Sequence, residues 1–315
     1  MNVLAKEPAA AGKGTPQGLT DRVLDSEKWL GRLLLGPAIL YIAALVGIPF
    51  FLALYYSVSD VTVGSRTMAF AGLSNFRRLL DNPTFLRSLA NTFIFALVSQ
   101  VIVIVLANIL ALALKRDFRG KWFVRLLILL PWVAPISLGS IGWLWILDSI
   151  YSVINWTLRH WGIFGPDTWP IWLGEPKLAM ASIITIHVWR LLPLATVILL
   201  GGLSSIPPDL EEAAAVDGAG FWRRLFQITM PLMLPITVVA LLFGLVFAFT
   251  DMIVIYVLTR GGPYDTTQVL ASYAFFTGIE GGSLSEGAAI ALFLFPVLAA
   301  SAILLLRFAR RAETA

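Results

Sequence analysis

The sequence contains no cysteine, only two histidines and few charged residues, and each scarcity excludes a class of protein. Without cysteine, disulfide bonds and thiolate metal sites are excluded. His160 and His187 are too few for a histidine-based metal site without help from carboxylates. Charged residues make up 13% of the 315 residues and hydrophobic residues 58%, whereas a soluble domain carries about a quarter charged residues. The composition therefore predicts an integral membrane protein.

Sequence motifs of nucleotide binding and catalysis are also absent. The two Gly-Lys pairs, Gly12–Lys13 and Gly120–Lys121, are followed by glycine and tryptophan, so there is no G-x-x-x-x-G-K-[ST] phosphate loop. No H-E-x-x-H segment, nucleophile elbow or pair of intramembrane carboxylates occurs. We therefore expect no catalytic residue, no metal site, no cofactor and no nucleic-acid partner in this chain. Any ATP and magnesium used would be bound by a separate chain.

Six apolar runs are long enough to cross a bilayer, which takes a helix of about 20 residues. They are Leu33–Ser59, Ser88–Leu114, Leu126–Leu147, Leu178–Ser205, Leu225–Thr250 and Gly287–Leu306. The predicted fold is an all-α integral membrane protein with six transmembrane helices and both termini on one side. Its predicted parts are an N-terminal tail at 1–32, partly disordered, a six-span domain at 33–306 and a C-terminal tail at 307–315.

Positive residues predict the orientation of these spans. Fifteen of the 23 lysines and arginines lie in the two tails and in the connections after the second and fourth runs, and seven lie in the opposite loops. Because positively charged loops stay in the cytoplasm, both termini and the connection at 206–230 are expected to face it. The first run is too long for a signal-peptide core, so we interpret it as a retained span.

The connection at 206–230 carries the signals of a short helix. Its first residues, IPPDLEE, place two prolines before three acids. Proline loses nothing at the first helical position, and acids favour the positive end of the helix dipole. Three alanines follow, and Gly218 offers a stop. Because small side chains permit close approach, we expect this helix to dock into a groove of another protein.

The same connection resembles a known motif. Glu212, Ala213 and Ala214 are followed after three residues by Gly218, and I-x-M-P begins at Ile228. This spacing is similar to the EAA loop of bacterial ABC importer permeases, which reads E-A-A, three residues, G, about nine residues and I-x-L-P. A D-G-A triplet, formed here by Asp217, Gly218 and Ala219, is also common in that family.

Two further blocks resemble the carbohydrate importers of the MalF/UgpA type. Residues 249–267, FTDMIVIYVLTRGGPYDTT, are similar to the segment that ends the fifth span in those permeases. Residues 188–193, VWRLLP, are similar to a W-R-x-x-P segment in the fourth. The resemblance covers about residues 33–311 and implies an ABC type I importer permease fold. We expect Gly261, Gly262 and Pro263 to form a tight turn at the outer end of the fifth span.

The resemblance also implies partners and a mechanism. These are a second homologous permease, two ATPase subunits in the cytoplasm, an extracytoplasmic substrate-binding protein and a sugar as cargo, in the bacterial inner membrane. The ATPase contacts that it implies, by matching position, are Glu212, Ala213, Ala214, Asp217, Gly218 and Ala219. ATP binding would bring the coupling helices together and switch the cavity between the permeases from inward-facing to outward-facing.

Two charged residues are candidates for the substrate pathway. Arg190 lies ~20 Å into its span, at 1.5 Å per residue, and an intramembrane charge is costly enough to suggest a function. It could bind sugar hydroxyls, form a structural ion pair or contact carbonyls freed near Pro193. Asp251, at the outer end of the fifth span, could accept hydrogen bonds from a sugar, stand as a helix-end charge or pair with the second permease.

Alternative functions remain open from the sequence. Glycerol 3-phosphate or another small solute could replace the sugar, although a phosphate would call for several basic residues and only Arg190 lies in a span. An ion-driven secondary transporter would need titratable groups near the membrane midplane, and Asp251 alone is thin support. A non-transporting scaffold is the third class. Four tryptophans at 148–177 predict interfacial anchors or, less favoured, a docking surface for an outside partner.

Overall fold

The computed structural model describes residues 27–65, 68–165 and 168–313, and the chain divides into two compact units at 1–52 and 53–315. The first unit contains α2 (Glu27–Ile42), the π-helical turn η1 (Ala43–Gly47) and the first half of α3 (Ile48–Ser57). Together these helices form an apolar stretch long enough to cross a membrane. The disorder predicted for the N-terminal tail lies mostly at 1–26, outside the described residues.

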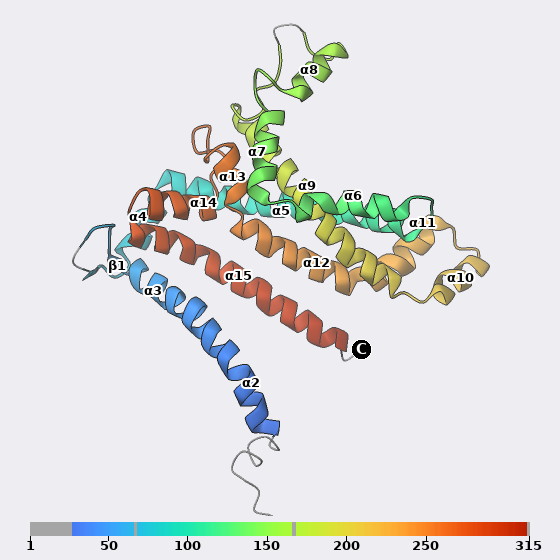
Figure 1. Cartoon of the computed structure of the whole chain (residues 1–315), viewed down its shortest axis with the longest axis horizontal. Coiled ribbons are helices and arrows are strands. Elements are labelled where there is room, and N and C mark those ends of the chain that lie inside the picture. The colour runs from blue at the N-terminus through green and yellow to red at the C-terminus, as the bar shows by residue number, and fades with distance from the viewer. Residues whose placement is uncertain (1–26, 66–67, 166–167, 314–315) are drawn as a thin grey trace, which may run out of the picture. The chain divides into compact units, whose positions relative to one another are not determined.

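The second unit is almost entirely helical (Figure 1). In chain order its elements after α3 are β1 (Ser59–Asp60), β2 (Ala69–Phe70), α4 (Ser74–Leu80), α5 (Pro83–Lys115), α6 (Lys121–Val133), α7 (Ile136–Ile146), α8 (Val153–His160), α9 (Pro176–Ser204), α10 (Pro208–Val216), α11 (Phe221–Arg224), η2 (Leu225–Thr229), α12 (Met230–Thr250), α13 (Ile253–Leu258), α14 (Leu270–Phe275), η3 (Phe276–Glu280) and α15 (Leu284–Glu313). The two short strands pair antiparallel, with Ser59 opposite Phe70, and are a small departure from the all-α prediction.

Five helical stretches within the described residues have the length and apolar character of a membrane span. They are Gly31–Ser57, Pro83–Lys115, Pro176–Ser204, Phe221–Thr250 and Leu284–Leu304. Each overlaps one predicted run, but the helices begin earlier, as at Pro83, where the Asn82 side chain accepts hydrogen bonds from the amides of Thr84 and Phe85. Helix α15 also continues through most of the predicted C-terminal tail.

The third predicted span is not one straight helix. Helices α6 and α7 meet at an angle of 96°, so residues 126–147 make a sixth span only if this bent pair is counted as one. The break falls at Ala134, whose ψ of 139° is extended, directly before Pro135. Proline disfavours the helical conformation in the residue that precedes it, which accounts for the position of the break.

The core of the second unit lies along α5 and α9, which share its most extensive contact. Small side chains, among them Ala96, Ala107 and Ala195, are buried on the facing surfaces and let the two helices approach closely. Phe95 of α5 packs against His187 of α9, and both Phe95 and Ile186 are at most 2% exposed. Helices α12 and α15 pack against this pair, α15 through its contact with α12.

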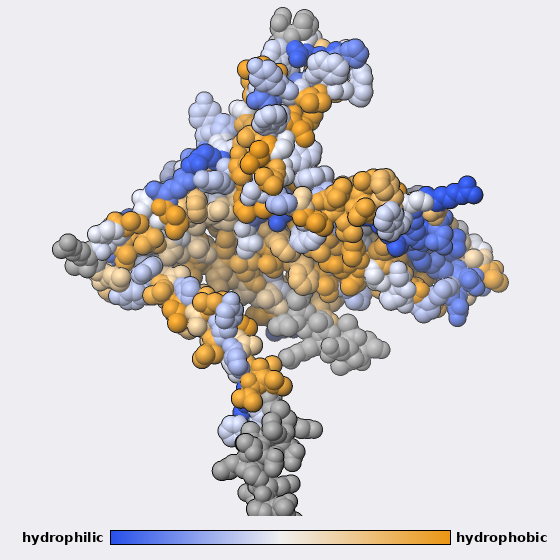
Figure 2. All heavy atoms as spheres, in the orientation of Figure 1, coloured by the Kyte–Doolittle hydropathy of each residue, from blue (hydrophilic) through white to orange (hydrophobic). Residues whose placement is uncertain are grey.

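The outer surfaces of these helices are apolar, and hydrophilic residues gather around α10 and α11, at the right of the view (Figure 2). Helix α8 and the segment around it extend away from the other helices of this unit at the top of Figure 1, whereas α7 packs against α13. The segment around α8 is held by Asn155, which is buried and accepts a hydrogen bond from Trp172 Nε1 at 2.9 Å. Trp156 and Trp161 are more than 60% exposed. Their roles as interfacial anchors or as a docking surface both stay predictions.

The segment around α8 begins with a carboxylate. Asp148 follows α7 and accepts hydrogen bonds from the backbone amides of Ile150 and Tyr151, each at 2.8 Å. The hydrogen bond from Tyr151, and to a lesser extent that from Ile150, stabilises the charged carboxylate and so lowers the pKa of Asp148 below its usual value. The segment therefore begins with a fixed negative charge.

Candidate coupling loop and membrane cleft

The short helix predicted in the connection after the fourth span is confirmed as α10. Pro208 is its first residue, and Asp209 and Glu211 lie in its first turn. The helix ends in a Schellman motif, because the amide of Ala219 bonds to the carbonyl of Ala214 at 2.9 Å and that of Gly218 to Ala215 at 3.1 Å. Gly218 has the left-handed φ of +76° that this ending requires. Helix resumes at Phe221, shortly before the start of the fifth predicted run at Leu225.

The two neighbouring acids of α10 differ in exposure and in partners. Glu211 is about one-third exposed and turns toward the transmembrane helices, whereas Glu212 is exposed. The two alanines of the motif divide in the same way, with Ala213 exposed and Ala214 only 9% exposed. The exposed residues of the motif are therefore Glu212, Ala213 and, beyond the helix, Asp217 and Gly218, whereas Ala219 is half-buried and Ala214 is buried.

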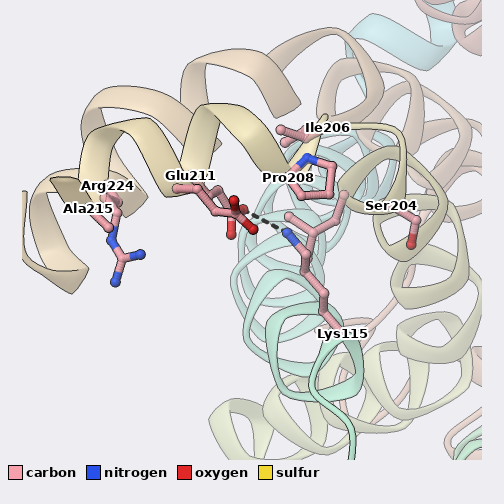
Figure 3. Close-up of a pocket in the computed structure, with 9 residues that line it drawn as sticks. Lys115, Ser204, Ile206, Pro208, Glu211, Ala215 and Arg224 are labelled. Carbon is pink, nitrogen blue, oxygen red and sulfur yellow. Dashed lines mark hydrogen bonds and ion pairs between the residues drawn. The ribbon is translucent and has the colours of Figure 1, made fainter.

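An open hollow of about 450 Å³ lies beside α10 (Figure 3). We call it the coupling hollow; it is lined by Lys115, Leu203, Ser204, Ile206, Pro208, Glu211, Glu212, Ala215 and Arg224. Lys115, the last residue of α5, points toward Glu211 in Figure 3, and its Nζ lies 2.7 Å from Glu211 Oε1. This ion pair joins α10 to a transmembrane helix.

A second hollow, of about 390 Å³, lies at the other end of α12. This membrane cleft is lined by Ile136, Arg190, Phe247, Thr250, Asp251, Met252, Ile253 and Ala271. The two charged candidates of the sequence, Arg190 and Asp251, are thus brought together in one wall. The remaining lining is mostly apolar, and the volume is within the usual range of small-molecule sites, about 300–1,000 Å³.

The charges in the cleft wall are paired. Asp251 Oδ2 lies 3.5 Å from Arg190 Nη1 and 2.7 Å from Nδ1 of His187, and the side chains of Asp251 and His187 are at most 2% exposed. The Arg190 guanidinium is 21% exposed and stands 5.9 Å from the ring of Trp132. Of the three roles considered for Arg190, the structure contains the ion pair, and the guanidinium still borders the cleft.

Residues 261–263 lie in a tight turn after α13. The Gly262 amide bonds to the carbonyl of Thr259 at 2.9 Å, and Gly262–Pro263 is a cis peptide. Gly261 has a φ of +88°, and the Thr267 amide bonds to its carbonyl. Asn91 of α5 donates from Nδ2 to the carbonyls of the same loop at 266 and 268. The three residues therefore shape a loop that is held against α5, and none of them lines the cleft.

Comparison with known proteins identifies the family. Residues 103–313 match the family described as "Binding-protein-dependent transport system inner membrane component". The chain belongs to this family. It is a permease subunit of an ABC import system and an inner-membrane component whose own role is transport.

Relatives match almost the whole chain. The "Trehalose/maltose transport system permease protein MalF" of Thermococcus litoralis is 31% identical and covers 93% of this chain and 97% of its own length. The "Sulfoquinovosyl glycerol transport system permease protein SmoG" of Agrobacterium fabrum is 33% identical over 85% of this chain and 86% of its own. The "sn-glycerol-3-phosphate transport system permease protein UgpA" of the same organism is 29% identical over 92% and 97%.

A solved structure supports the fold. A chain of a bacterial alginate ABC transporter, "in complex with alginate pentasaccharide-bound periplasmic protein", superposes with a TM-score of 0.76 at 22% identity, covering 90% of this permease and 95% of that chain. The ABC type I importer permease fold inferred from the sequence is confirmed.

Sequence reasoning missed three residues of these two sites. For His187 the sequence favours a packed and hydrogen-bonded side chain over a proton carrier, but its partner Asp251, 64 positions away, was not predicted. Lys115 and Glu211 were counted for orientation and for helix dipole alone, although they pair across 96 positions. No local signal marks either pair, because each depends on how α5, α9, α10 and α12 pack.

Proposed function

We propose that this permease forms half of the pathway of an ATP-driven importer and that α10 docks into a separate ATPase subunit. One observation carries the proposal. The residues with the EAA spacing form a helix that exposes Glu212 and Ala213 and ends at the glycine of a Schellman motif. Small side chains on that face permit close seating in a groove. Cytoplasmic termini follow from the distribution of lysine and arginine.

The remaining partners are a second, homologous permease, a second ATPase subunit and an extracytoplasmic binding protein. The periplasmic protein in the related alginate transporter supports this assembly. When ATP closes the ATPase pair, the coupling helices of the two permeases approach each other. The permeases then rotate as rigid bodies and expose the cleft to the outside, where the binding protein releases its cargo.

The cargo that we propose is a neutral mono- or oligosaccharide. Arg190 is the one basic residue that lines the cleft, and its charge is balanced by Asp251 3.5 Å away. The wall therefore offers hydrogen-bonding groups without net positive charge, together with the Phe247 ring, and this suits sugar hydroxyls better than a phosphate. The trehalose/maltose permease among the relatives supports the same class, whereas the glycerol-3-phosphate permease supports the alternative cargo.

Uptake into proteoliposomes tests the proposal. The complete importer would be reconstituted and supplied separately with radiolabelled trehalose, maltose and glycerol 3-phosphate, with and without ATP and the ATPase subunit. We expect accumulation of a sugar that requires both ATP and the ATPase. Uptake driven by a proton gradient alone would identify a secondary transporter. Uptake restricted to glycerol 3-phosphate would overturn the sugar assignment. If none of the solutes is taken up, a non-transporting scaffold would be the function that remains.

A further inference from the structure

The ion pair between Lys115 and Glu211 is the only hydrogen bond or ion pair that links an α10 side chain to another element in the described part of the chain. The coupling hollow lies beside Pro208, Glu211, Glu212 and Ala215 of α10, and Ala214 is the one buried residue of this helix, so apolar packing contributes little to holding it in place. Exposed ion pairs contribute little to stability, and both side chains are about one-third exposed. We therefore assign to the ion pair a role in positioning α10 rather than in stabilising the fold.

The two charges stand at helix ends that favour them. Lys115 occupies the last turn of α5 and Glu211 the first turn of α10, so each side chain has the sign that its own helix dipole stabilises. The end of α5 is further held by α6, because Lys121 donates to the carbonyl of Lys115 at 3.3 Å and Arg125 to that of Leu114 at 3.4 Å. The end of α5 is therefore a firm attachment point.

Helix α5 connects this attachment point with the membrane cleft. Phe95 lies on the same uninterrupted helix as Lys115, about 30 Å away at 1.5 Å per residue. Its ring packs edge-on against His187 at a centroid distance of 4.7 Å, and His187 contacts Asp251 in the cleft wall. A contiguous route of contacts thus runs from α10 through α5 to the charged pair at the cleft.

We propose that Lys115 is a positioning residue that ties the coupling helix to α5, so that α10 and α5 move together when the ATPase displaces α10. Glu211 makes the tie, while its neighbour Glu212 is exposed and forms no ion pair within the described residues. The inference rests on the proposed docking of α10. It adds that force enters the transmembrane helices through one ion pair at the end of α5, in addition to the covalent connections to α9 and α11.

Spin labels can measure this tie directly, because the chain has no cysteine of its own. Cysteines at Val101 on α5 and Val216 on α10, which are 62% and 88% exposed, would carry the labels. Their distance distribution would be recorded in the permease in nanodiscs and in the assembled importer, made with cysteine-free partners, before and after trapping with ATP and vanadate. We expect one narrow distance that is the same in both states.

Charge reversals test the role of the pair. Lys115→Glu and Glu211→Lys are each expected to broaden the distance distribution between the labels. The double exchange should restore the narrow distribution, and Lys115→Arg should keep it. Asp117→Asn, which breaks the neighbouring surface pair with Lys121, is the matched control and keeps it. A narrow distance that survives both single reversals, or that the double exchange does not restore, would overturn the inference. The nanodisc measurement needs no ATPase, so an importer that fails to assemble would count against the proposed function alone.

Discussion

Nδ1 of His187 lies 2.7 Å from Oδ2 of Asp251, and both side chains are buried where α9 meets the end of α12. The two atoms are within hydrogen-bond distance, and Nε2 of His187 has no hydrogen-bond partner among the described residues. The same carboxylate oxygen faces Arg190 at 3.5 Å. One buried acid therefore fixes a histidine and an arginine from successive turns of α9.

Removing this acid is expected to destabilise the permease strongly. Asp251→Ala leaves Arg190 and His187 without their common partner, and loss of one member of a buried pair costs about 3–5 kcal/mol. Asp251→Asn retains the shape and an acceptor for His187, so we expect a smaller loss. The midpoint of thermal unfolding of the detergent-solubilised permease measures both, with Asp117→Asn as a surface control. Equal midpoints for Asp251→Ala and the parent would contradict a stabilising role of the pair.

The ending of α10 predicts how position 218 responds to substitution. Gly218 has a φ of +76°, and a Cβ there would meet no atom of the described residues within 4 Å, so conformation rather than space limits this position. A left-handed residue other than glycine costs about 1–2 kcal/mol, while asparagine adopts this conformation more readily. We expect Gly218→Val to reduce the amount of ATPase that copurifies with tagged permease by about tenfold, the equivalent of about 1.4 kcal/mol.

Gly218→Asn is the matched control, since its side chain is of similar size to valine. Retention of the ATPase by the asparagine variant and loss by the valine variant would locate the requirement in the Schellman turn. Equal loss in both would show instead that the groove excludes any side chain at this position. Undiminished copurification with Gly218→Val would contradict the docking of this loop.

The two glycines before Pro263 are expected to differ in tolerance. A Cβ on Gly261 would collide with the Gln268 amide, and its φ of +88° is left-handed. A Cβ on Gly262 would lie 3.2 Å from the carbonyl oxygen of Thr259, at a φ open to other residues. Gly261→Ala should therefore lower the unfolding temperature more than Gly262→Ala. The reverse order would mean that the turn is remodelled rather than strained.

The crossing of α5 and α12 allows a compensation experiment. A Cβ at Gly244 would overlap the side-chain amide of Gln100, which is 2% exposed and makes no hydrogen bond within the described residues. Gly244→Ala overpacks the core, which is expected to reduce the free energy of unfolding by about 1–3 kcal/mol and so to lower the unfolding midpoint. Adding Gln100→Ala removes the obstructing amide and should restore much of the loss. Independent, additive effects of the two changes would contradict a direct contact between them.

Local signals in the sequence predicted the membrane class, the apolar spans and the short helix at 208–216. These features depend on composition, run length and helix ends, which are properties of neighbouring residues. The bend between α6 and α7 was missed because the apolar run at 126–147 is continuous and only its hydrophobicity was considered. The local proline rule would have found it.

What the sequence by itself determined is thus the class of the protein, the position of its helices and the motif that α10 presents. Only the tertiary structure decided that Glu211 pairs with Lys115 while the exposed Glu212 does not, and that Asp251 contacts both His187 and Arg190. Both outcomes depend on which faces of distant helices meet. Helix–helix contact brings together side chains 60 to 100 positions apart, for which spacing along the chain holds no signal.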